Sequence, residues 1–474
     1  MIFTRRAVLA GGMAAFAAPA LRGATPNDVD IVRRAYTLLH PGLLRYNTTR
    51  QMEARFGRFA YEWGSSNALA PKYLALTRLL AGIKCGHSYA NFYNQSDKVA
   101  GALFSGRNRL PFRFRWIGSE MVVTDGDLPR GTVVRSIDGR PTAMILNALL
   151  PLARADGSNN AKRRQLLSVT GVDDYEMFDI YYPLLFPTSD SFRIEARAPG
   201  GQPIRATLAA IDLKTRQAAR ATAKPTDKNA PQWTIVHDGK TSALTMDGWA
   251  LYNSTWDWKG WLDQSFAEMD RRGTDRLIID LRRNEGGLDC GQEIIARLID
   301  TPLVLGGFAR RVRYRRVPDD LLPYCDTWDP SFKDWGTDAT PYDARFFNLK
   351  GDGDGPASIT PKGPRFRGRV FVLIGPENSS ATFQFASLIK ANKLGTLVGE
   401  PTGGNQRGIN GGAFFFLRLP ESGLEADIPL IGYFPDKAMP DAGITPDVLA
   451  PVTARDIASG RDAAMERAMG SQKA

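Results

Sequence analysis

The chain has 474 residues, of which 43% are hydrophobic and 23% are charged. These fractions are those of ordinary globular proteins and exclude wholesale disorder, and the length predicts two or three domains because one hydrophobic core rarely organises so many residues. The net charge is +11, but the basic residues are spread along the chain, so we expect no nucleic acid partner. One basic cluster, residues 310–316, alternates like a strand with a solvated face.

Residues 1–24 are predicted to be a signal peptide. Arg5 and Arg6 precede an apolar run of small residues that is too short to span a bilayer. The segment resembles a twin-arginine export signal, with cleavage after Ala20 or Ala24, and such signals carry folded proteins. We therefore expect an exported protein, periplasmic or extracellular, without stable membrane insertion. An uncleaved anchor or an ordinary N-terminus is the alternative.

The cysteines and histidines do not form a metal-binding pattern. The three cysteines (Cys85, Cys290 and Cys325) include no CxxC pair, and none of the three histidines has another four residues on. This spacing favours neither a zinc site nor a disulfide framework, so we expect no metal and no cofactor. A disulfide between Cys290 and Cys325 after export stays open.

The N-terminal half is predicted to contain a helical region and a β domain. In residues 25–105 apolar side chains recur at helical spacing up to a turn that carries Gly86 and His87. Residues 106–212 contain short alternating strands, an Asp-Gly turn and a hairpin. They resemble a PDZ domain that carries an insertion. Such a domain would bind the terminus of another chain as an added strand at the edge of its sheet. A generic small β module is the alternative.

The C-terminal half is predicted to be an α/β domain. Residues 213–231 are polar and indicate a linker, and residues 456–474 indicate a tail. Between them, in residues 232–455, apolar strands alternate with helices, which is typical of a parallel sheet covered on both faces. The expected strands are 242–246, 276–281 and 369–374, and the expected helices are 258–271, 290–299 and 381–393. Residues 318–365 are expected to be irregular.

Two strand ends in this domain suggest a catalytic site. The strand that ends at Leu281 leads to Gly286 and Gly287, where backbone amides can face a ligand without obstruction. The strand that ends at Ile374 leads to Ser380, at the start of a helix whose positive N-terminal field and free amides suit a developing anion. From spacing alone, a serine at a helix start such as Ser380 is more often a helix N-cap than a nucleophile.

Several motifs in order resemble the C-terminal processing (tail-specific) peptidase family. They are LIIDLRRNEGG, then VFVLIGPENSSATFQFASLIKANKLGTLVGEPTGG, then GITPD, and they extend over about residues 235–450. The resemblance implies a core with the fold shared by ClpP and the crotonases. It also implies a serine endopeptidase whose nucleophile is Ser380, with an oxyanion hole formed by Gly286 or Gly287 and the amide of Ala381.

The resemblance also separates two branches of that family. One uses a lysine as base just after the GEPT segment, but Asn405 occupies that position here. The other, similar to the tricorn core protease, implies His87 as the general base, although Cys85 replaces the usual acidic residue before the turn. In this branch a glutamate shortly before the G-x-x-PD motif orients the histidine. Pro440 occupies the nearest equivalent position here, so the resemblance implies Asp441, one residue further on, with Glu400 as the alternative.

The sequence therefore predicts an exported serine endopeptidase that cleaves protein or peptide substrates through an acyl-enzyme. A non-catalytic binding module on the same fold is the alternative, and its discriminating feature would be loss of Ser380 or His87, both of which are present. A crotonase-type acyl-CoA enzyme would fit the fold, but the export signal would separate it from CoA. A homo-oligomer is possible.

Overall fold

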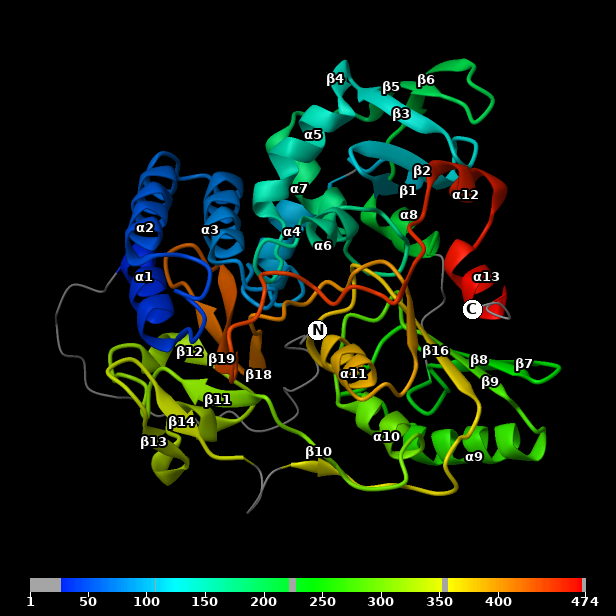
Figure 1. Cartoon of the computed structure of the whole chain (residues 1–474). Helices are drawn as coiled ribbons and strands as arrows, with labels where there is room; N and C mark the ends of the chain where they lie inside the picture. Colours follow the sequence, from blue (N-terminus) through cyan, green and yellow to red (C-terminus); the bar gives the residue numbers. More distant parts are fainter. Residues whose placement is uncertain (1–26, 107, 221–226, 352–356, 471–474) are drawn as a thin grey trace.

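A computed structural model describes residues 27–106, 108–220, 227–351 and 357–470. The predicted signal peptide lies outside these residues. Figure 1 shows a mixed α/β protein, and the described chain contains three six-stranded sheets and one two-stranded sheet. In the described part, no helix is both long and apolar enough to cross a bilayer.

The N-terminal region is helical, as predicted. Its helices are α1 (Asp28–Leu39), α2 (Thr49–Gly64), α3 (Leu69–Ile83) and α4 (Asp97–Phe104). A capping box between Thr48 and Gln51 starts α2. Lys84, with φ of 63°, ends α3 two residues before the glycine that was expected to break it. His87 therefore lies on a turn just after a rigid helix.

An antiparallel sheet follows, in the strand order β1-β2-β3-β5-β6, with β4 paired to β3. Its strands are β1 (Phe112–Ile117), β2 (Glu120–Gly126), β3 (Val133–Ile137), β4 (Arg140–Pro141), β5 (Ser191–Arg197) and β6 (Pro203–Ala209). The expected hairpin is confirmed, since Phe192 pairs with Leu208. The helices of this region are α5 (Thr142–Leu149), η2 (Leu150–Leu152), α6 (Asn160–Leu166), α7 (Met177–Leu185) and α8 (Leu213–Ala218).

Helix α8 lies at the beginning of the predicted linker. Its Arg216 is buried and donates from Nε to Oδ2 of Asp179, 2.8 Å away. The polar composition of residues 213–231 suggested solvation, but a buried ion pair anchors the beginning of this segment to α7. A helix therefore occupies residues 213–218 of the predicted linker.

A mostly parallel sheet forms the core of the C-terminal half, in the order β20-β17-β16-β9-β8-β7. Its strands are β7 (Thr234–Asp238), β8 (Thr241–Thr245), β9 (Arg276–Asp280), β16 (Arg369–Ile374), β17 (Thr396–Gly399) and β20 (Val448–Leu449). The helices that follow its strands are α9 (Trp258–Arg271), α10 (Cys290–Ala296) and α11 (Ser380–Ala391). The predicted parallel pairing is confirmed, and β7 joins β8 as an antiparallel edge strand.

Both faces of this sheet are buried. Leu277 and Ile279 of β9 pack in the larger apolar cluster with α9, α10 and α11, while Ile278 packs on the opposite face. That opposite face is covered by α13 (Ala463–Gly470), which follows α12 (Ala454–Ser459). Residues 463–470 of the predicted tail therefore pack on the sheet, and Arg282 pairs with Asp462 at 2.7 Å just before them.

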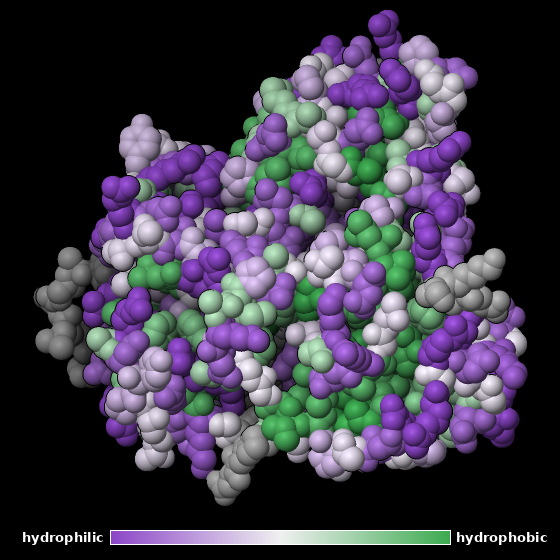
Figure 2. All heavy atoms as spheres, in the orientation of Figure 1, coloured by the Kyte–Doolittle hydropathy of each residue, from purple (hydrophilic) through white to green (hydrophobic). Residues whose placement is uncertain are grey.

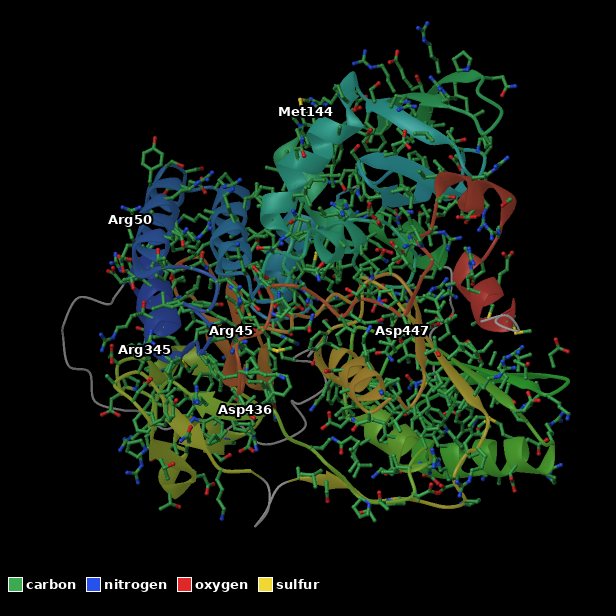
Figure 3. All side chains as sticks on the ribbon, in the orientation of Figure 1. Arg45, Arg50, Met144, Arg345, Asp436 and Asp447 are labelled. Atoms are coloured by element: carbon green, nitrogen blue, oxygen red, sulfur yellow. The ribbon has the colours of Figure 1, made fainter. Side chains whose placement is uncertain are left out.

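A third sheet, in the order β12-β18-β19-β11-β14-β13, packs against the N-terminal helices (Figure 1). Its strands are β11 (Phe308–Val312), β12 (Cys325–Asp326), β13 (Ala339–Pro341), β14 (Phe347–Leu349), β18 (Asn410–Arg418) and β19 (Glu425–Pro435). The hydroxyl of Tyr36 in α1 donates to the carbonyl of Asp427 in β19 at 2.9 Å. Arg45 stacks on the ring of Phe434 at 4.4 Å, beside β18 and β19 (Figure 3).

Residues 318–365 are less irregular than expected. They contain β12, β13 and β14, and the remaining elements of the segment and its flank are β10 (Leu303–Val304), β15 (Ser358–Ile359), η3 (Leu322–Tyr324), η4 (Pro330–Lys333) and η5 (Gly336–Asp338). Cys325 in β12 and Cys290 in α10 are both buried and free, so they do not form the disulfide that the sequence left open.

Candidate active site

Ser380 lies where a strand turns sharply into a helix. Strand β16 ends at Ile374, and α11 begins at Ser380, whose φ of 51° is left-handed and unfavourable for a residue with a side chain. The N-cap position belongs to Ser379, whose side chain makes no capping bond and instead donates to the carbonyl of Glu285 at 3.2 Å. Ser380 is therefore not a helix cap, and the turn holds it in a strained conformation.

Two buried asparagines fix this turn. Nδ2 of Asn378 donates to the carbonyls of Leu281 and Asn284, at 2.5 and 2.9 Å, and its Oδ1 accepts from the amide of Gly375 at 2.8 Å. Oδ1 of Asn284 accepts from Oγ1 of Thr382 at 2.8 Å. The loop after β9 and the turn after β16 are thus joined by buried hydrogen bonds, which are costly to break.

The paired glycines lie directly beside Ser380. A Cβ atom on Gly286 would lie 2.9 Å from Cβ of Ser380 and 3.2 Å from the amide nitrogen of Ala381. The amide of Gly286 already donates to Oδ1 of Asn284 at 2.9 Å. Among the described residues, the amides of Gly287 and Ala381 donate to no protein acceptor. This leaves Gly287 and Ala381 as the pair that can bind an oxyanion.

Ser380, Ala381 and Gly287 open onto a cavity of about 490 Å³ between α11 and the third sheet. Its wall is largely apolar, and the apolar and aromatic residues that line it include Tyr252, Leu288, Leu305, Phe308, Trp328, Phe383, Leu388, Ile409 and Tyr433. Figure 2 shows hydrophobic surface over α10 and α11 on this face. Such a concave apolar site beside a few aligned polar groups is typical of a substrate pocket.

His87 does not line this cavity but lies next to Gly411, which does. A Cβ atom on Gly411, which lines the cavity, would be 3.9 Å from Cε1 of His87, and the imidazole packs 5.9 Å from the ring of Phe414. Burial, with a smaller contribution from Arg154, lowers the pKa of His87 to about 3. The imidazole is therefore neutral at pH 7 and able to accept a proton. Within the described chain no hydrogen bond joins it to Ser380.

The two acids predicted to orient His87 lie elsewhere. Asp441 accepts from the amide and hydroxyl of Ser158, both at 2.9 Å, and from Nδ2 of Asn405 at 2.7 Å. Glu400 lines a second cavity, of about 620 Å³, and its nearest charged partner is Arg115 at 3.8 Å. Neither carboxylate hydrogen-bonds His87, so the structure gives neither prediction support.

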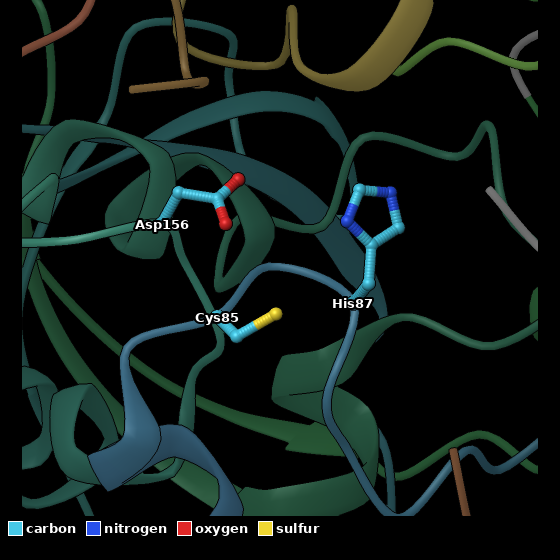
Figure 4. Close-up of side chains that lie close together, drawn as sticks. All are labelled: Cys85, His87 and Asp156. Carbon is cyan, nitrogen blue, oxygen red and sulfur yellow. The ribbon is translucent and has the colours of Figure 1, made fainter. Parts of the chain in front are cut away.

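A different carboxylate lies next to His87. Asp156, Cys85 and His87 each place a polar atom within 4.8 Å of the other two, and all three side chains are buried (Figure 4). Asp156 was not predicted as a site residue, because it is a single acid in a segment predicted to be an insertion, about 70 residues from the turn. No local pattern distinguishes it from a solvated acid.

These three side chains offer sulfur, nitrogen and oxygen donors, which is a set that zinc accepts. However, Sγ of Cys85 accepts from Nδ2 of Asn410 at 3.3 Å, and burial raises the pKa of the Cys85 thiol, which favours its neutral form. Three cations, Arg45, Arg154 and Lys162, also act on Asp156. This positive surrounding disfavours a further cation, so we assign no metal here.

A buried ion-pair network lies between the turn of His87 and the glycine loop. Oε1 of Glu285 lies 2.9 Å from Nη1 of Arg154 and 2.7 Å from Nζ of Lys162. Burial alone would raise the pKa of Glu285, but these two cations hold it well below the usual range. Arg154 also donates to the carbonyl of Gly86 at 2.5 Å, so the network connects both halves of the site.

Comparison with known protein families gives one match. The profile of Peptidase family S41 matches residues 241–450, which run from β8 to β20 and contain the paired glycines and Ser380. No curated protein sequence matches the chain.

The chain also resembles solved structures at low sequence identity. Mature CPAF complexed with lactacystin superposes with a TM-score of 0.58 and 14% identity, and covers 94% of this chain and 96% of its own. The photosystem II D1 C-terminal processing protease gives a TM-score of 0.39 and 15% identity, over 92% of this chain and 97% of its own. The tricorn protease gives 0.37 and 15%, over 94% of this chain and 36% of its own.

Proposed function

We propose that this chain, a serine-type peptidase that carries a domain of peptidase family S41, uses Ser380 as its nucleophile and His87 as its general base. The observation that carries the proposal is the position of Ser380. It is a strained serine at the start of a helix, it opens onto a large cavity, and two amides without protein acceptors lie beside it. Strain of this kind persists where function requires it.

The first half of the proposed reaction is acyl transfer to the enzyme. Oγ of Ser380 bonds to the carbonyl carbon of the substrate while Nε2 of His87 takes the hydroxyl proton. The carbonyl oxygen becomes an oxyanion, which the amides of Gly287 and Ala381 stabilise. The carbon–nitrogen bond then breaks, and His87 returns its proton to the leaving amine. Hydrogen bonds of this kind often form only when substrate is bound.

The second half is hydrolysis of the acyl-enzyme. His87, now neutral again, takes a proton from water, whose oxygen bonds to the acyl carbon. The bond to Oγ of Ser380 breaks, and the serine recovers its proton from His87. His87 is neutral at pH 7, which is the form that each proton abstraction requires.

The cavity supports a preference for bulky apolar side chains next to the cleaved bond. Its described wall carries one carboxylate, Asp289, and no lysine or arginine. Burying a charged substrate side chain there without a partner would be unfavourable. Peptides with phenylalanine or leucine at that position should be cleaved faster than peptides with lysine or glutamate. The variant Leu388→Lys, with a charge in the wall, should lose this preference.

We also propose export of the protein and terminus binding by the β domain. Arg5, Arg6 and the following apolar run support export through a twin-arginine signal. The antiparallel sheet of β1 to β6, with α5 beside it, supports a PDZ-like role in strand addition, and the parallel core with its covering helices supports a ClpP/crotonase-like fold. Sequencing the N-terminus of protein secreted by a producing cell tests export.

Labelling with a fluorophosphonate, followed by intact-mass measurement, tests the catalytic proposal. The wild type and the control variant Ser379→Ala should each gain one label, because the Ser379 hydroxyl donates to a backbone carbonyl. Ser380→Ala and His87→Ala should gain none while keeping the melting temperature of a folded protein. Labelling of Ser380→Ala would contradict the proposal. A folded wild type that never labels would favour the alternative function, a non-catalytic binding module.

A further inference from the structure

Two buried polar atoms without partners lie close together behind the cavity. They are Nδ1 of His87 and Oδ2 of Asp156, and neither has a hydrogen-bond partner among the described residues. His87 is 5% exposed and Asp156 is 1% exposed, so water does not readily satisfy them. Figure 4 shows the carboxylate of Asp156 and one ring nitrogen of His87 facing each other, with the second ring nitrogen turned away. An unpaired buried donor or acceptor is costly and rare.

The backbone holds Asp156 against the turn of His87. Oδ1 of Asp156 accepts from the amide of Gly86 at 2.9 Å, which leaves Oδ2 as the free oxygen. The amide of Gly157 donates to the carbonyl of Lys84 at 2.9 Å. A Cβ atom on Gly86 would lie 2.8 Å from Oδ2 of Asp156, so the glycine permits this close approach. Asp156 is therefore fixed relative to His87 by the residue just before it.

We propose that Asp156 is the positioning residue of His87: its Oδ2 accepts the Nδ1 proton and thereby leaves Nε2 unprotonated for the hydroxyl of Ser380. This inference rests on the proposed function, in which His87 is the base. One hydrogen bond would satisfy both unpartnered atoms. When His87 accepts the serine proton, the imidazolium charge would face the Asp156 carboxylate.

Other partners for these atoms fit less well. Asp441 is engaged by Ser158 and Asn405. Arg45 is the competing partner for Asp156, but it stacks on Phe434 and forms no ion pair with Asp156 within the described chain. Cys85 lies in the same cluster, but a neutral thiol is a poorer hydrogen-bond acceptor than a carboxylate.

The histidine tautomers provide a direct test in the unmodified protein. The chain has three histidines. Nδ1 of His40 accepts from the amide of Gly42 at 3.0 Å, and its Nε2 lies 2.8 Å from Oγ of Ser88, so His40 carries its proton on Nε2. Nitrogen-15 NMR of histidine-labelled protein at pH 7, assigned with His87→Ala, should show the opposite tautomer for His87, with the proton on Nδ1. A proton on Nε2 of His87 would overturn the proposal.

Kinetics test the same inference independently. Asp156→Asn keeps an acceptor for the Gly86 amide but can turn a donor toward Nδ1, which favours the wrong tautomer. We expect kcat for an apolar peptide to fall about 10²- to 10⁴-fold, with KM changed little. Asp441→Asn, as matched control, should keep kcat within a few-fold. Wild-type kcat in Asp156→Asn, with activity lost in His87→Ala, would overturn the role of Asp156 alone. Activity retained in His87→Ala would instead reject the proposed base.

Discussion

The amide of Gly286 donates to Oδ1 of Asn284 at 2.9 Å, and this bond separates the roles of the two neighbouring glycines. Because that amide is occupied, Gly287 is the glycine whose N–H can bind an oxyanion. The same asparagine oxygen accepts from Oγ1 of Thr382, and its Nδ2 donates to the carbonyl of Met246 at 3.0 Å. One buried side chain thus fixes the glycine loop against the helix of the nucleophile.

Replacing Asn284 should therefore reduce catalysis, although Asn284 does not line the cavity. We expect Asn284→Ala to lower kcat about 10²-fold, since a shift of about 1 Å in a catalytic group can have that effect. Thr382→Val is the control, because it removes one bond to Asn284 and leaves the bond to Gly286 intact. It should lower the free energy of unfolding by about 1 kcal/mol and keep most of the activity. Equal losses of kcat in both variants would contradict this assignment.

The left-handed conformation of Ser380 should lower the free energy of unfolding by a measurable amount. At φ near 51°, a residue with a Cβ atom destabilises the folded protein by about 1 kcal/mol relative to glycine. We expect Ser380→Gly to raise the free energy of unfolding relative to Ser380→Ala by about that amount, in urea titrations at pH 7. Neither variant should label. If Ser380→Ala were the more stable variant, the serine would not be strained in the folded protein.

The buried His87 should make stability depend on pH in a defined direction. Its folded pKa is about 3, below the unfolded value of 6.5, so the unfolded chain binds a proton that the folded chain excludes between these limits. Stability contributed by this group is therefore lost as pH falls from about 6.5 toward 3. Compared with His87→Ala, the wild type should lose about 1.4 kcal/mol more for each pH unit in that window.

His237→Ala serves as the control for this pH dependence. His237 lies on an edge strand and is half-buried. Burial lowers its pKa less strongly than it lowers the pKa of His87. Its replacement should change the slope of stability against pH much less than His87→Ala does. Urea unfolding at half-unit steps between pH 4.5 and about pH 7 measures both slopes. Parallel curves for the wild type and His87→Ala would show that His87 titrates normally in the folded protein.

The parts of the site that could be predicted from sequence are the residues that directly follow the strands β9 and β16. The strands β9 and β16 are continuous apolar runs, and parallel pairing brings their carboxyl ends together. This is why Ser380, Ala381 and the glycine pair could be placed near each other. The motifs predicted a domain of this peptidase family, and the match of Peptidase family S41 to residues 241–450 confirms that domain.

The parts that could not be predicted depend on contacts between distant segments. Asp156 reaches His87 only because the segment of residues 154–157 folds back on the end of α3. The third sheet pairs short strands of residues 308–349 with β18 and β19 more than 70 residues later, and such short strands have no alternation long enough to recognise. Asp441 and Glu400 were predicted by their positions near motifs, whereas Asp156, whose carboxylate contacts the turn of His87, lies near no motif.

Removing one charge from the buried network of Glu285, Arg154 and Lys162 should destabilise the protein more than removing a charge from a surface ion pair. Lys162 is 1% exposed and lies 2.7 Å from Oε1 of Glu285, so removing it leaves a buried carboxylate that Arg154 alone compensates. We expect Lys162→Met to lower the free energy of unfolding by about 3 kcal/mol. Adding Glu285→Gln to this variant should cost less than the sum of the single changes, because the two groups interact.

A surface ion pair provides the matched control for that experiment. Arg33 and Glu53 form an ion pair whose side chains are about half exposed, and pairs of this kind contribute about 0–1 kcal/mol. Arg33→Met should therefore change stability little. Since Glu285 precedes the glycine pair in the chain, Lys162→Met should also slow fluorophosphonate labelling, while Arg33→Met should not. Equal effects of Lys162→Met and Arg33→Met on stability and labelling would show that the buried network does not support the site.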